Sequence, residues 1–341
     1  MSNDAPDSSD PRPTLAQVAR AAGVSEITAS RALRGGPHVA PPTLERVLAA
    51  ARALNYVPNR LAGALAGGRS GQVAVVLPSL SNSVFADVLN GLETRLERAG
   101  HHPILGVSNY DPAREEGLIA GLLSWRPAGL VIAPAASTEG TRRMLAGAGL
   151  PVVEIMDIDR PPIDISVGLS QRTAGRATAQ YLLGRGYRRF AYVGHAIDGD
   201  PRAVARREGL ALGLAEAGAA LEAELCLPGP SSVPLGRAAV AQLLEGRAPG
   251  GLAVCFSNDD MAVGGMFHAL SAGLRVPQDI ALMGFNGLAI GQALPQPLTT
   301  IASHRAEIGQ GAADALLARL AGETTPARID VGFRLISGAT A

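Results

Sequence analysis

The sequence of 341 residues contains no lysine, only two cysteines, few aromatic residues and no apolar run of membrane-spanning length. Cys226 and Cys255 cannot form a disulfide framework, and buried thiols in a reducing cytoplasm are their ordinary state. A membrane-spanning helix needs about 18–20 consecutive apolar residues, so we expect none. The first fourteen residues are acidic and polar, unlike a secretory signal. Because codon composition alone can remove lysine, we infer no function from its absence.

Motifs of catalysis and of metal binding are also missing. The histidines form neither an HxxxH pair nor a cluster with cysteine, which a transition-metal site would need. No GxGxxG turn follows the first apolar run, no phosphate-binding P-loop is present, and no nucleophile–histidine–acid set can be recognised. We therefore expect neither an enzyme nor a bound cofactor or metal.

Charge is distributed unevenly along the chain, although 30 arginines and 30 acidic residues give a net charge of zero. Residues 1–11 have a net charge of −3. Residues 12–70 contain eight arginines and two glutamates, a net charge of +6, and the remainder has a net charge of −3. A small basic module joined to a mildly acidic body indicates contact with nucleic acid at one end of the chain.

Three short helices are predicted in the basic module. Thr14 can N-cap a helix over 15–22, and Ser25 can cap a second helix that runs to about Leu33. Two consecutive prolines open a third helix over 43–53. Two helices joined by a short glycine-containing turn, with a third that closes the core, form a helix-turn-helix domain. A helical bundle that binds protein is the alternative, and the +6 charge favours DNA.

From residue 72 onward, short apolar runs alternate with amphipathic stretches. The runs span 72–78, 102–108, 129–134, 151–157, 164–170, 188–194, 252–258 and 280–286. The helical stretches span 84–99, 112–125, 172–185, 204–217, 235–245 and 260–273. This alternation is typical of βαβ units and of parallel sheets covered on both faces. Two similar series of runs predict two doubly wound lobes, with a ligand bound in the cleft at the carboxyl ends of the strands.

Motifs along nearly the whole chain resemble those of the lactose/galactose-repressor (LacI/GalR) family. The basic module contains TLAQVARAAGVSEITASRALRG at 14–35, LNYVPNR at 54–60 and LAG at 65–67. The body contains VLPSLSNSVFADVLNGLE at 76–93, ARREGL at 205–210, SNDDMAVG at 257–264, VPQDIALMGFN at 276–286 and PLTTI at 297–301. Within that family, the segments at 122–125, 151–168 and 286–298 most resemble gluconate-utilisation repressors.

The resemblance implies an all-α helix-turn-helix head and an α/β periplasmic-binding-protein-like core of two doubly wound parallel-sheet lobes. The expected parts are a disordered tail over 1–11, a DNA-binding domain over 12–59, a hinge helix and linker over 60–70, and a two-lobed effector-binding and dimerisation domain over 71–341. Lobe 1 is expected at about 71–165 and 299–325, and lobe 2 at about 166–298 and 326–341.

The resemblance also implies which residues meet DNA. Glu26 and Ile27 occupy the positions that vary with the operator; a carboxylate can accept a hydrogen bond from cytosine, and an isoleucine can contact a thymine methyl. Leu65 matches a leucine that wedges into the minor groove when the hinge helix folds on DNA. The implied DNA contacts are Thr14, Leu15, Ser25, Glu26, Ile27, Thr28, Ser30, Arg31, His38, Tyr56, Asn59, Arg60 and Leu65.

Between the lobes, the resemblance implies an effector site. Arg206 matches the family's ligand-contacting arginine, and Arg202 can add a second positive group. Asn286 stands where many family members have an aspartate, and two arginines with a neutral amide favour a sugar acid, because guanidinium binds carboxylate in bidentate fashion. Asp157 can equally cap a turn, and Phe85 can equally belong to the core. The candidate effector contacts are Ser81, Asn82, Phe85, Glu154, Asp157, Arg202, Arg206, Asn258, Asp259 and Asn286.

These observations predict a cytoplasmic homodimeric repressor that binds a pseudo-palindromic operator in double-stranded DNA, because two half-sites need two heads. The expected effector is a sugar acid such as gluconate or gluconate 6-phosphate, which releases the operator; no membrane contact is expected. A tetramer, a regulator of another sugar and a corepressor-dependent regulator stay open. A sugar-binding transport protein shares the two-lobe fold, but it needs a signal peptide and no DNA-binding head.

Overall fold

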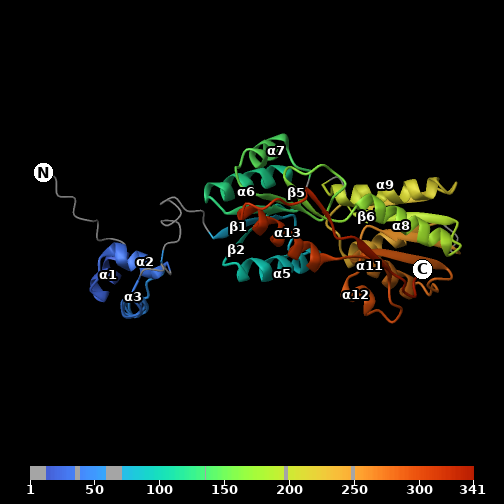
Figure 1. Ribbon diagram of the computed structural model, residues 1–341. Helices are drawn as coiled ribbons and strands as arrows, with labels where there is room; N and C mark the ends of the chain where they lie inside the picture. The colour runs from blue at the N-terminus through green and yellow to red at the C-terminus, as the bar shows by residue number, and fades with distance from the viewer. Residues whose placement is uncertain (1–12, 35–38, 59–70, 135, 196–198, 247–249) are drawn as a thin grey trace. The chain divides into compact units, whose positions relative to one another are not determined.

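The computed structural model describes residues 13–34, 39–58, 71–134, 136–195, 199–246 and 250–341 (Figure 1). The chain divides into two units, Met1–Ser70 and Gly71–Ala341. Several predictions fall outside the described residues: the tail over 1–11, the hinge helix and linker over 60–70, and the DNA contacts His38, Asn59, Arg60 and Leu65.

The first unit contains three helices that share one small apolar core. They are α1 (Leu15–Ala22), α2 (Glu26–Leu33) and α3 (Pro41–Ala53). Each helix contributes buried residues to this core, among them Val18 of α1, Ala29 of α2 and Val47 of α3. The three predicted helices are confirmed, and the third begins two residues earlier than expected, at the first of its two prolines.

The turn between α1 and α2 is determined by local sequence. Thr14 Oγ1 accepts a hydrogen bond from the Gln17 amide (3.3 Å), and Gln17 Oε1 accepts one from the Thr14 amide (2.9 Å), so the predicted cap is a capping box. Gly23 ends α1 with φ of 64°, a left-handed conformation that glycine adopts without strain. Ser25 Oγ then accepts a bond from the Thr28 amide (3.2 Å) and starts α2. These caps set the angle at which α2 leaves α1.

The second unit is built on two six-stranded sheets. Its strands are β1 (Gln72–Leu77), β2 (His102–Val107), β3 (Gly129–Ile132), β4 (Val152–Ile155), β5 (Ile165–Gly168), β6 (Arg189–His195), β7 (Leu221–Leu227), β8 (Leu252–Phe256), β9 (Ile280–Asn286), β10 (Thr299–Ser303), β11 (Arg328–Asp330) and β12 (Phe333–Ile336). The first sheet has the order β11-β5-β4-β3-β1-β2 and the second β12-β10-β9-β8-β6-β7. Strand pairs are parallel except β10 and β12. We call the parts built on them lobe 1 and lobe 2.

Helices cover both faces of each sheet (Figure 1). They are α5 (Ser83–Arg98), α6 (Pro112–Ser124), α7 (Glu139–Ala146), α8 (Gln171–Gly184), α9 (Pro201–Ala215), α10 (Val233–Leu244), α11 (Asp259–Ser271), α12 (Ala289–Gln292) and α13 (Arg305–Leu320). In lobe 1, α5 and α13 pack on one face and α6 and α7 on the other; in lobe 2, α8 and α9 lie opposite α10 and α11. Among the described residues, no helix has both the length and the apolar character to span a bilayer.

The structure confirms the eight predicted strands and six predicted body helices, but it corrects the lobe boundaries. β5 pairs with β4 in lobe 1, β10 pairs with β9 in lobe 2, and β11 pairs with β5 in lobe 1. The expected boundaries at 165/166, 298/299 and 325/326 each placed one of these strands in the wrong lobe. The chain crosses to the other lobe only after β5, β10 and β11 have ended. The sequence of an apolar run does not show which sheet the strand joins.

A close contact between α8 and α9 determines where the second helix lies in lobe 2. A Cβ atom added to Gly175 would lie 2.1 Å from the Arg206 carbonyl oxygen, and one added to Gly209 would lie 2.1 Å from the Arg172 carbonyl oxygen. The two backbones therefore touch at both glycines, with no space for a side chain. This contact places Arg206 of α9 beside the carboxyl ends of the strands.

We expect Gly175→Ala to lower the free energy of unfolding by at least about 2 kcal/mol, because the new methyl group meets a carbonyl that cannot move away alone. Gly184→Ala in the same helix is the matched control. A Cβ atom there has no neighbour within 4 Å, so alanine should be neutral or stabilise by up to about 1 kcal/mol. Urea unfolding of both variants measures the difference, and equal effects would contradict the contact.

Candidate functional site

The face of α2 that points away from the core of the head carries the predicted base-reading residues. Ile27 is 66% exposed, and Glu26 and Arg31 are also exposed, whereas Ala29 and Ala32 are buried. The exposed side of α2 thus presents an apolar group, a carboxylate and a guanidinium. These are the chemical groups that read base edges and contact phosphates in a major groove.

Other predicted DNA contacts have partners within the head. Leu15 and Tyr56 are partly buried and pack against its apolar core. Thr14 and Ser25 cap the two helices, and the Ser25 and Thr28 hydroxyls share a hydrogen bond of 2.9 Å. Ser30 is partly buried, and its carbonyl accepts a bond from Arg34 Nε (3.2 Å). The structure therefore gives Leu15 and Tyr56 a part in the core, and DNA contact by this group stays a prediction.

Six of the predicted effector residues meet in one inner pocket between the lobes. These six are Asn82, Phe85, Arg202, Arg206, Asn258 and Asn286. The pocket has a volume of about 30 Å³, which is room for about two water-sized groups. An outer chamber of about 470 Å³ adjoins it, since Asn82, Tyr110 and His195 line both spaces. Ser81, the seventh predicted residue, lines this outer chamber.

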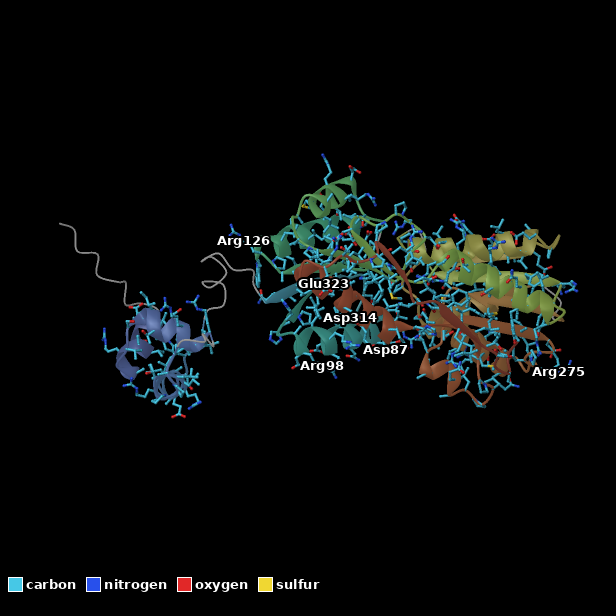
Figure 2. All side chains as sticks on the ribbon, in the orientation of Figure 1. Asp87, Arg98, Arg126, Arg275, Asp314 and Glu323 are labelled. Carbon is cyan, nitrogen blue, oxygen red and sulfur yellow. The ribbon has the colours of Figure 1, made fainter. Side chains whose placement is uncertain are left out.

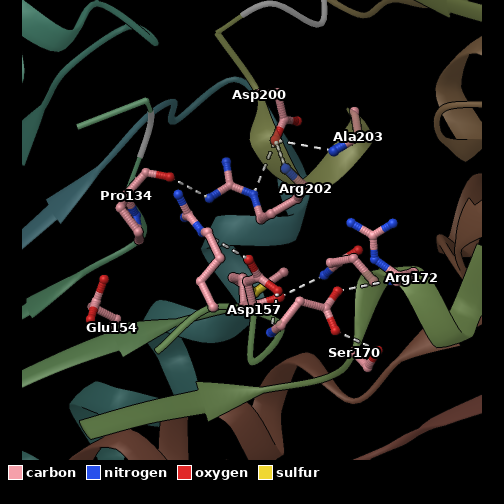
Figure 3. Close-up of polar contacts among 12 residues, drawn as sticks. Pro134, Glu154, Asp157, Ser170, Arg172, Asp200, Arg202 and Ala203 are labelled. Atoms are coloured by element: carbon pink, nitrogen blue, oxygen red, sulfur yellow. Dashed lines mark hydrogen bonds and ion pairs between the residues drawn. The ribbon is translucent and has the colours of Figure 1, made fainter. Parts of the chain in front are cut away.

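Arg202 crosses from lobe 2 to lobe 1 (Figure 3). Its side chain is almost completely buried; Nε lies 3.2 Å from Asp200 Oδ1, and Nη1 donates to the Pro134 carbonyl at 2.9 Å. The guanidinium carbon lies 5.9 Å from the centre of the Phe85 ring. Nη2 is buried with no hydrogen-bond partner among the described residues. A buried donor without an acceptor is costly, so this atom is ready to bind an anionic oxygen.

Arg206 is held from several sides. Nη1 donates to Gln171 Oε1 (2.7 Å), and Nη2 donates to the Ser257 carbonyl (3.0 Å). Its guanidinium carbon also lies 4.2 Å from the centre of the Phe285 ring, within cation–π distance. The orientation of Arg206 therefore exists before any ligand binds.

The charges that line the inner pocket do not cancel. Burial alone would raise the pKa of Asp200, but the guanidiniums of Arg202 and Arg206 lower it below its ordinary value. Burial lowers the pKa of His195, whose Nδ1 lies 3.0 Å from the Ser257 hydroxyl. One ionised carboxylate thus faces two guanidiniums, which leaves a net charge of +1. The described residues contain no group of three or more His, Cys, Asp or Glu that could hold a metal ion.

Three predicted effector residues have other partners. Glu154 lies apart from the arginine cluster, where its carboxylate accepts a bond from the Ile163 amide (2.6 Å) (Figure 3). Asp157 accepts a bond from the Asp159 amide (2.9 Å), which is the turn cap that the sequence left as its alternative role. Among the described residues, neither is part of the lining of the pocket or the chamber.

Asp259 is the third of these residues. Its carboxylate is completely buried and accepts hydrogen bonds from the Leu288 amide (2.6 Å) and the Thr300 hydroxyl (2.7 Å). It therefore holds the chain segment that follows β9, and its contact with an effector stays a prediction. The first turn of α11 points this side chain inward, and the sequence pattern alone does not show that direction.

Seven lining residues were missed: Val84, Tyr110, Met156, Gln171, His195, Asp200 and Phe285. His195 and Phe285 stand at the carboxyl ends of β6 and β9, the same position that indicated Asn258 and Asn286. Applying that rule to every strand would have found both. Asp200 precedes Arg202 in the DPR sequence, so its role as counter-ion had a local signal.

Comparison with known proteins agrees with this arrangement. The chain matches bacterial regulatory proteins of the lacI family over residues 14–59 and a periplasmic binding protein-like domain over residues 179–341. It is 42% identical to the HTH-type transcriptional regulator GntR of Pseudomonas aeruginosa over 96% of this chain and 95% of that protein. The identity with the regulator GntR of Escherichia coli is 35%, over 96% of this chain and 98% of that protein.

Solved structures agree as well. A LacI-family transcriptional regulator from Silicibacter pomeroyi has a TM-score of 0.91 and 42% identity, covering 96% of this chain and 99% of that one. The lac repressor dimer bound to operator and the anti-inducer ONPF has a TM-score of 0.83 and 27% identity, with coverage of 96% and 99%. A helix-turn-helix head and a two-lobed body define a transcriptional regulator and not an enzyme. The chain belongs to the lacI family of bacterial regulatory proteins.

The buried carboxyl of Asp259 should make stability depend on pH. Burial raises its pKa to about 6, although the bonds from Thr300 and Leu288 oppose this. A carboxyl in the unfolded chain has a pKa of about 4. Because the folded state binds the proton more tightly, the stabilisation is present below about pH 4 and is lost as the pH rises through about 6.

We expect the free energy of unfolding of the wild type, relative to Asp259→Asn, to fall by up to about 3 kcal/mol between about pH 4 and 7. Urea unfolding at several pH values measures this difference. The matched control is Glu93→Gln, which changes an exposed carboxylate on α5. A difference for Asp259→Asn that does not vary with pH would show that its carboxyl titrates normally.

Proposed function

We propose that the protein represses genes for the use of a sugar acid, with gluconate as the first candidate, and that the sugar acid releases it from its operator. The observation that carries this proposal is the pair of Arg202, which is buried, and Arg206, which is partly buried, in a pocket of net charge +1. A monoanionic carboxylate neutralises that charge and supplies the acceptor that Arg202 Nη2 lacks among the described residues.

The outer chamber supports a polyhydroxylated ligand. Its volume of about 470 Å³ lies within the range of small-molecule sites, and Ser81, Tyr110, Ser231 and Asp260 line it with hydroxyl and carboxylate groups. A six-carbon acid can direct its carboxylate to the arginines and its hydroxyl groups into the chamber. The resemblance of three segments to gluconate-utilisation repressors makes gluconate the first ligand to test.

The proposed mechanism is a shift between two arrangements of the lobes. Arg202 belongs to lobe 2, and its Pro134 acceptor belongs to lobe 1. A carboxylate at Arg202 Nη2 contacts a guanidinium whose position depends on this interlobe bond, so the ligand binds the two arrangements with different affinity and changes their populations. The change reaches DNA through the segment that joins the body to the head.

The DNA-bound form is proposed to be a homodimer in the bacterial cytoplasm, because a pseudo-palindromic operator presents two equivalent half-sites. Glu26, Ile27 and Arg31 of each copy would face the major groove. Stronger DNA binding in the presence of the sugar acid would instead make the ligand a corepressor. Operator titration with and without gluconate distinguishes an inducer from a corepressor.

We expect Arg206→Ala to weaken gluconate binding at least about 100-fold, because it removes a partly buried charge partner of the carboxylate. Arg207→Ala is the matched control, since the adjacent Arg207 points toward Glu224 (3.5 Å) outside the pocket. Isothermal titration calorimetry measures both variants. Glucitol, which carries a hydroxymethyl group in place of the carboxylate, should bind the wild type at least about 100-fold more weakly.

Equal binding of gluconate and glucitol would contradict the role of the two arginines. Equal losses in Arg206→Ala and Arg207→Ala would show that the loss has a cause other than the pocket. The operator affinity of Arg206→Ala without ligand should match the wild type, which confirms that the variant is folded.

We expect Ile27→Ala to reduce the preference for one base pair in each half-site by about 1–2 kcal/mol, because the contact with a thymine methyl is lost. Selection of bound duplexes from a random-sequence library, for the wild type and the variant, measures that preference. Leu48→Ala, which shortens an exposed leucine on α3, is the control and should leave the selected sequence unchanged. An unchanged selected sequence for Ile27→Ala would exclude it as a base contact.

A further inference from the structure

The corner that follows β9 joins the ligand pocket to the rest of the body. Asn286, its first residue, has φ of 109°, a left-handed conformation that costs a non-glycine residue about 1–3 kcal/mol. Its side chain lines the inner pocket, whereas its backbone carbonyl accepts a hydrogen bond from Arg305 Nη1. One residue therefore meets both the ligand site and lobe 1.

Arg305 is the first residue of α13 in lobe 1, so its bond to Asn286 crosses from lobe 1 to lobe 2. Its Nε also donates to Asp87 Oδ2 on α5 at 2.8 Å. The Arg305 side chain is 14% exposed, which limits its screening by solvent. The guanidinium thus links the corner of lobe 2 to two helices of lobe 1.

The two helices of lobe 1 are in backbone contact with each other. A Cβ atom added to Gly91 of α5 would lie 2.3 Å from the Ala306 carbonyl oxygen, and one added to Gly309 of α13 would lie 2.0 Å from the Val88 carbonyl oxygen. Neither helix can shift along the other without breaking these contacts. A displacement of Arg305 therefore acts on α5 and α13 together.

The corner itself has little freedom to absorb a movement. Asp259 holds the Leu288 amide from within lobe 2 (2.6 Å), and a Cβ atom added to Gly287 would lie 2.7 Å from the Ala302 Cβ. A groove of about 540 Å³, lined by Asp87 and Arg305 of lobe 1 and by Gly287 of lobe 2, gives the guanidinium space to leave. The corner is thus fixed in lobe 2, and Arg305 is its movable connection to lobe 1.

We infer that Arg305 is a positioning residue that couples occupancy of the inner pocket to the orientation of α5 and α13, and thereby to operator affinity. The inference rests on the proposed function, since it concerns how the proposed effector signal leaves the pocket. A ligand that contacts the Asn286 side chain alters the position of its carbonyl. The Arg305 guanidinium then moves with that carbonyl or releases it, and either event changes the contact between the lobes.

The chain offers a matched control for this role. Arg95 of α5 and Asp314 of α13 join the same two helices, with 3.7 Å between Arg95 Nε and Asp314 Oδ1, and both are exposed. Figure 2 shows Asp87 nearer to lobe 2 and Asp314 farther from it. Removing Arg95 thus removes a link between the helices and leaves the corner unchanged.

The test measures the affinity of full-length protein for a duplex selected from a random-sequence library with the wild type. Fluorescence anisotropy gives this affinity with and without saturating gluconate for the wild type, Arg305→Gln and Arg95→Gln. We expect Arg305→Gln to reduce the gluconate effect at least about fivefold and to change the gluconate-free affinity at least about threefold. Arg95→Gln should stay within about twofold of the wild type in both quantities.

Asp87→Asn is a second variant, and we expect it to fold because the Asp87 side chain is half-exposed. Like Arg305→Gln, it should reduce the effect of gluconate on operator affinity. Calorimetry of gluconate binding to Arg305→Gln without DNA distinguishes a positioning residue from a residue that contacts the ligand. Binding that stays within about fivefold of the wild type supports a positioning role, since linkage limits its change to the lost coupling. Loss of binding together with loss of the effect would make Arg305 a ligand contact and overturn the inference.

Failure of the proposed function can be distinguished from failure of this inference. If gluconate leaves the wild-type affinity unchanged, gluconate induction is wrong, and the gluconate-free affinities then decide about Arg305. A change confined to Arg305→Gln and Asp87→Asn supports the coupling role. Equal affinities for Arg305→Gln, Arg95→Gln and the wild type overturn it.

Discussion

The guanidinium of Arg202 is buried between the lobes, and that of Arg206 is partly buried in the same pocket. A charge removed from water is costly unless partners replace the lost solvation. Asp200 and the Pro134 carbonyl serve Arg202, while Gln171 and the Ser257 carbonyl serve Arg206. These partners come from both lobes and from strand ends as well as helices. The closeness of the lobes and the burial of Arg202 therefore depend on each other, because Pro134 belongs to lobe 1.

Glycines occur where the helices of each lobe cross. Gly175 and Gly209 let α8 and α9 touch, and Gly91 and Gly309 do the same for α5 and α13. Each contact removes the freedom of two helices to slide, so each lobe moves as a rigid body. A change at the cleft is then expressed as a movement between lobes and not as local deformation.

Most helices and strands could be predicted from the sequence, because helix caps and apolar runs are determined by residues that lie close together in the chain. Thr14 and Ser25 predict the starts of α1 and α2, and apolar runs predict the strands that are buried on both faces. The positions of β10 and β11 did not follow, since the lobe that a strand joins is decided by contacts with residues far away in sequence. Similarly, Asp259 and Asn258 are neighbours at one helix start, yet only Asn258 faces the pocket, and sequence spacing does not reveal that direction.

The side chain of Asn286 influences which ligand binds, whereas its backbone carbonyl connects the ligand pocket to lobe 1. Its amide side chain adds no negative charge to a pocket that already contains Asp200, so the side chain favours an anionic ligand. Its carbonyl is part of the backbone and bonds Arg305 whatever the side chain is. An aspartate at this position would therefore oppose an anionic ligand and still retain the link to lobe 1. Ligand class can thus change through one side chain while the connection between cleft and helices stays intact, because that connection depends on backbone geometry and on Arg305.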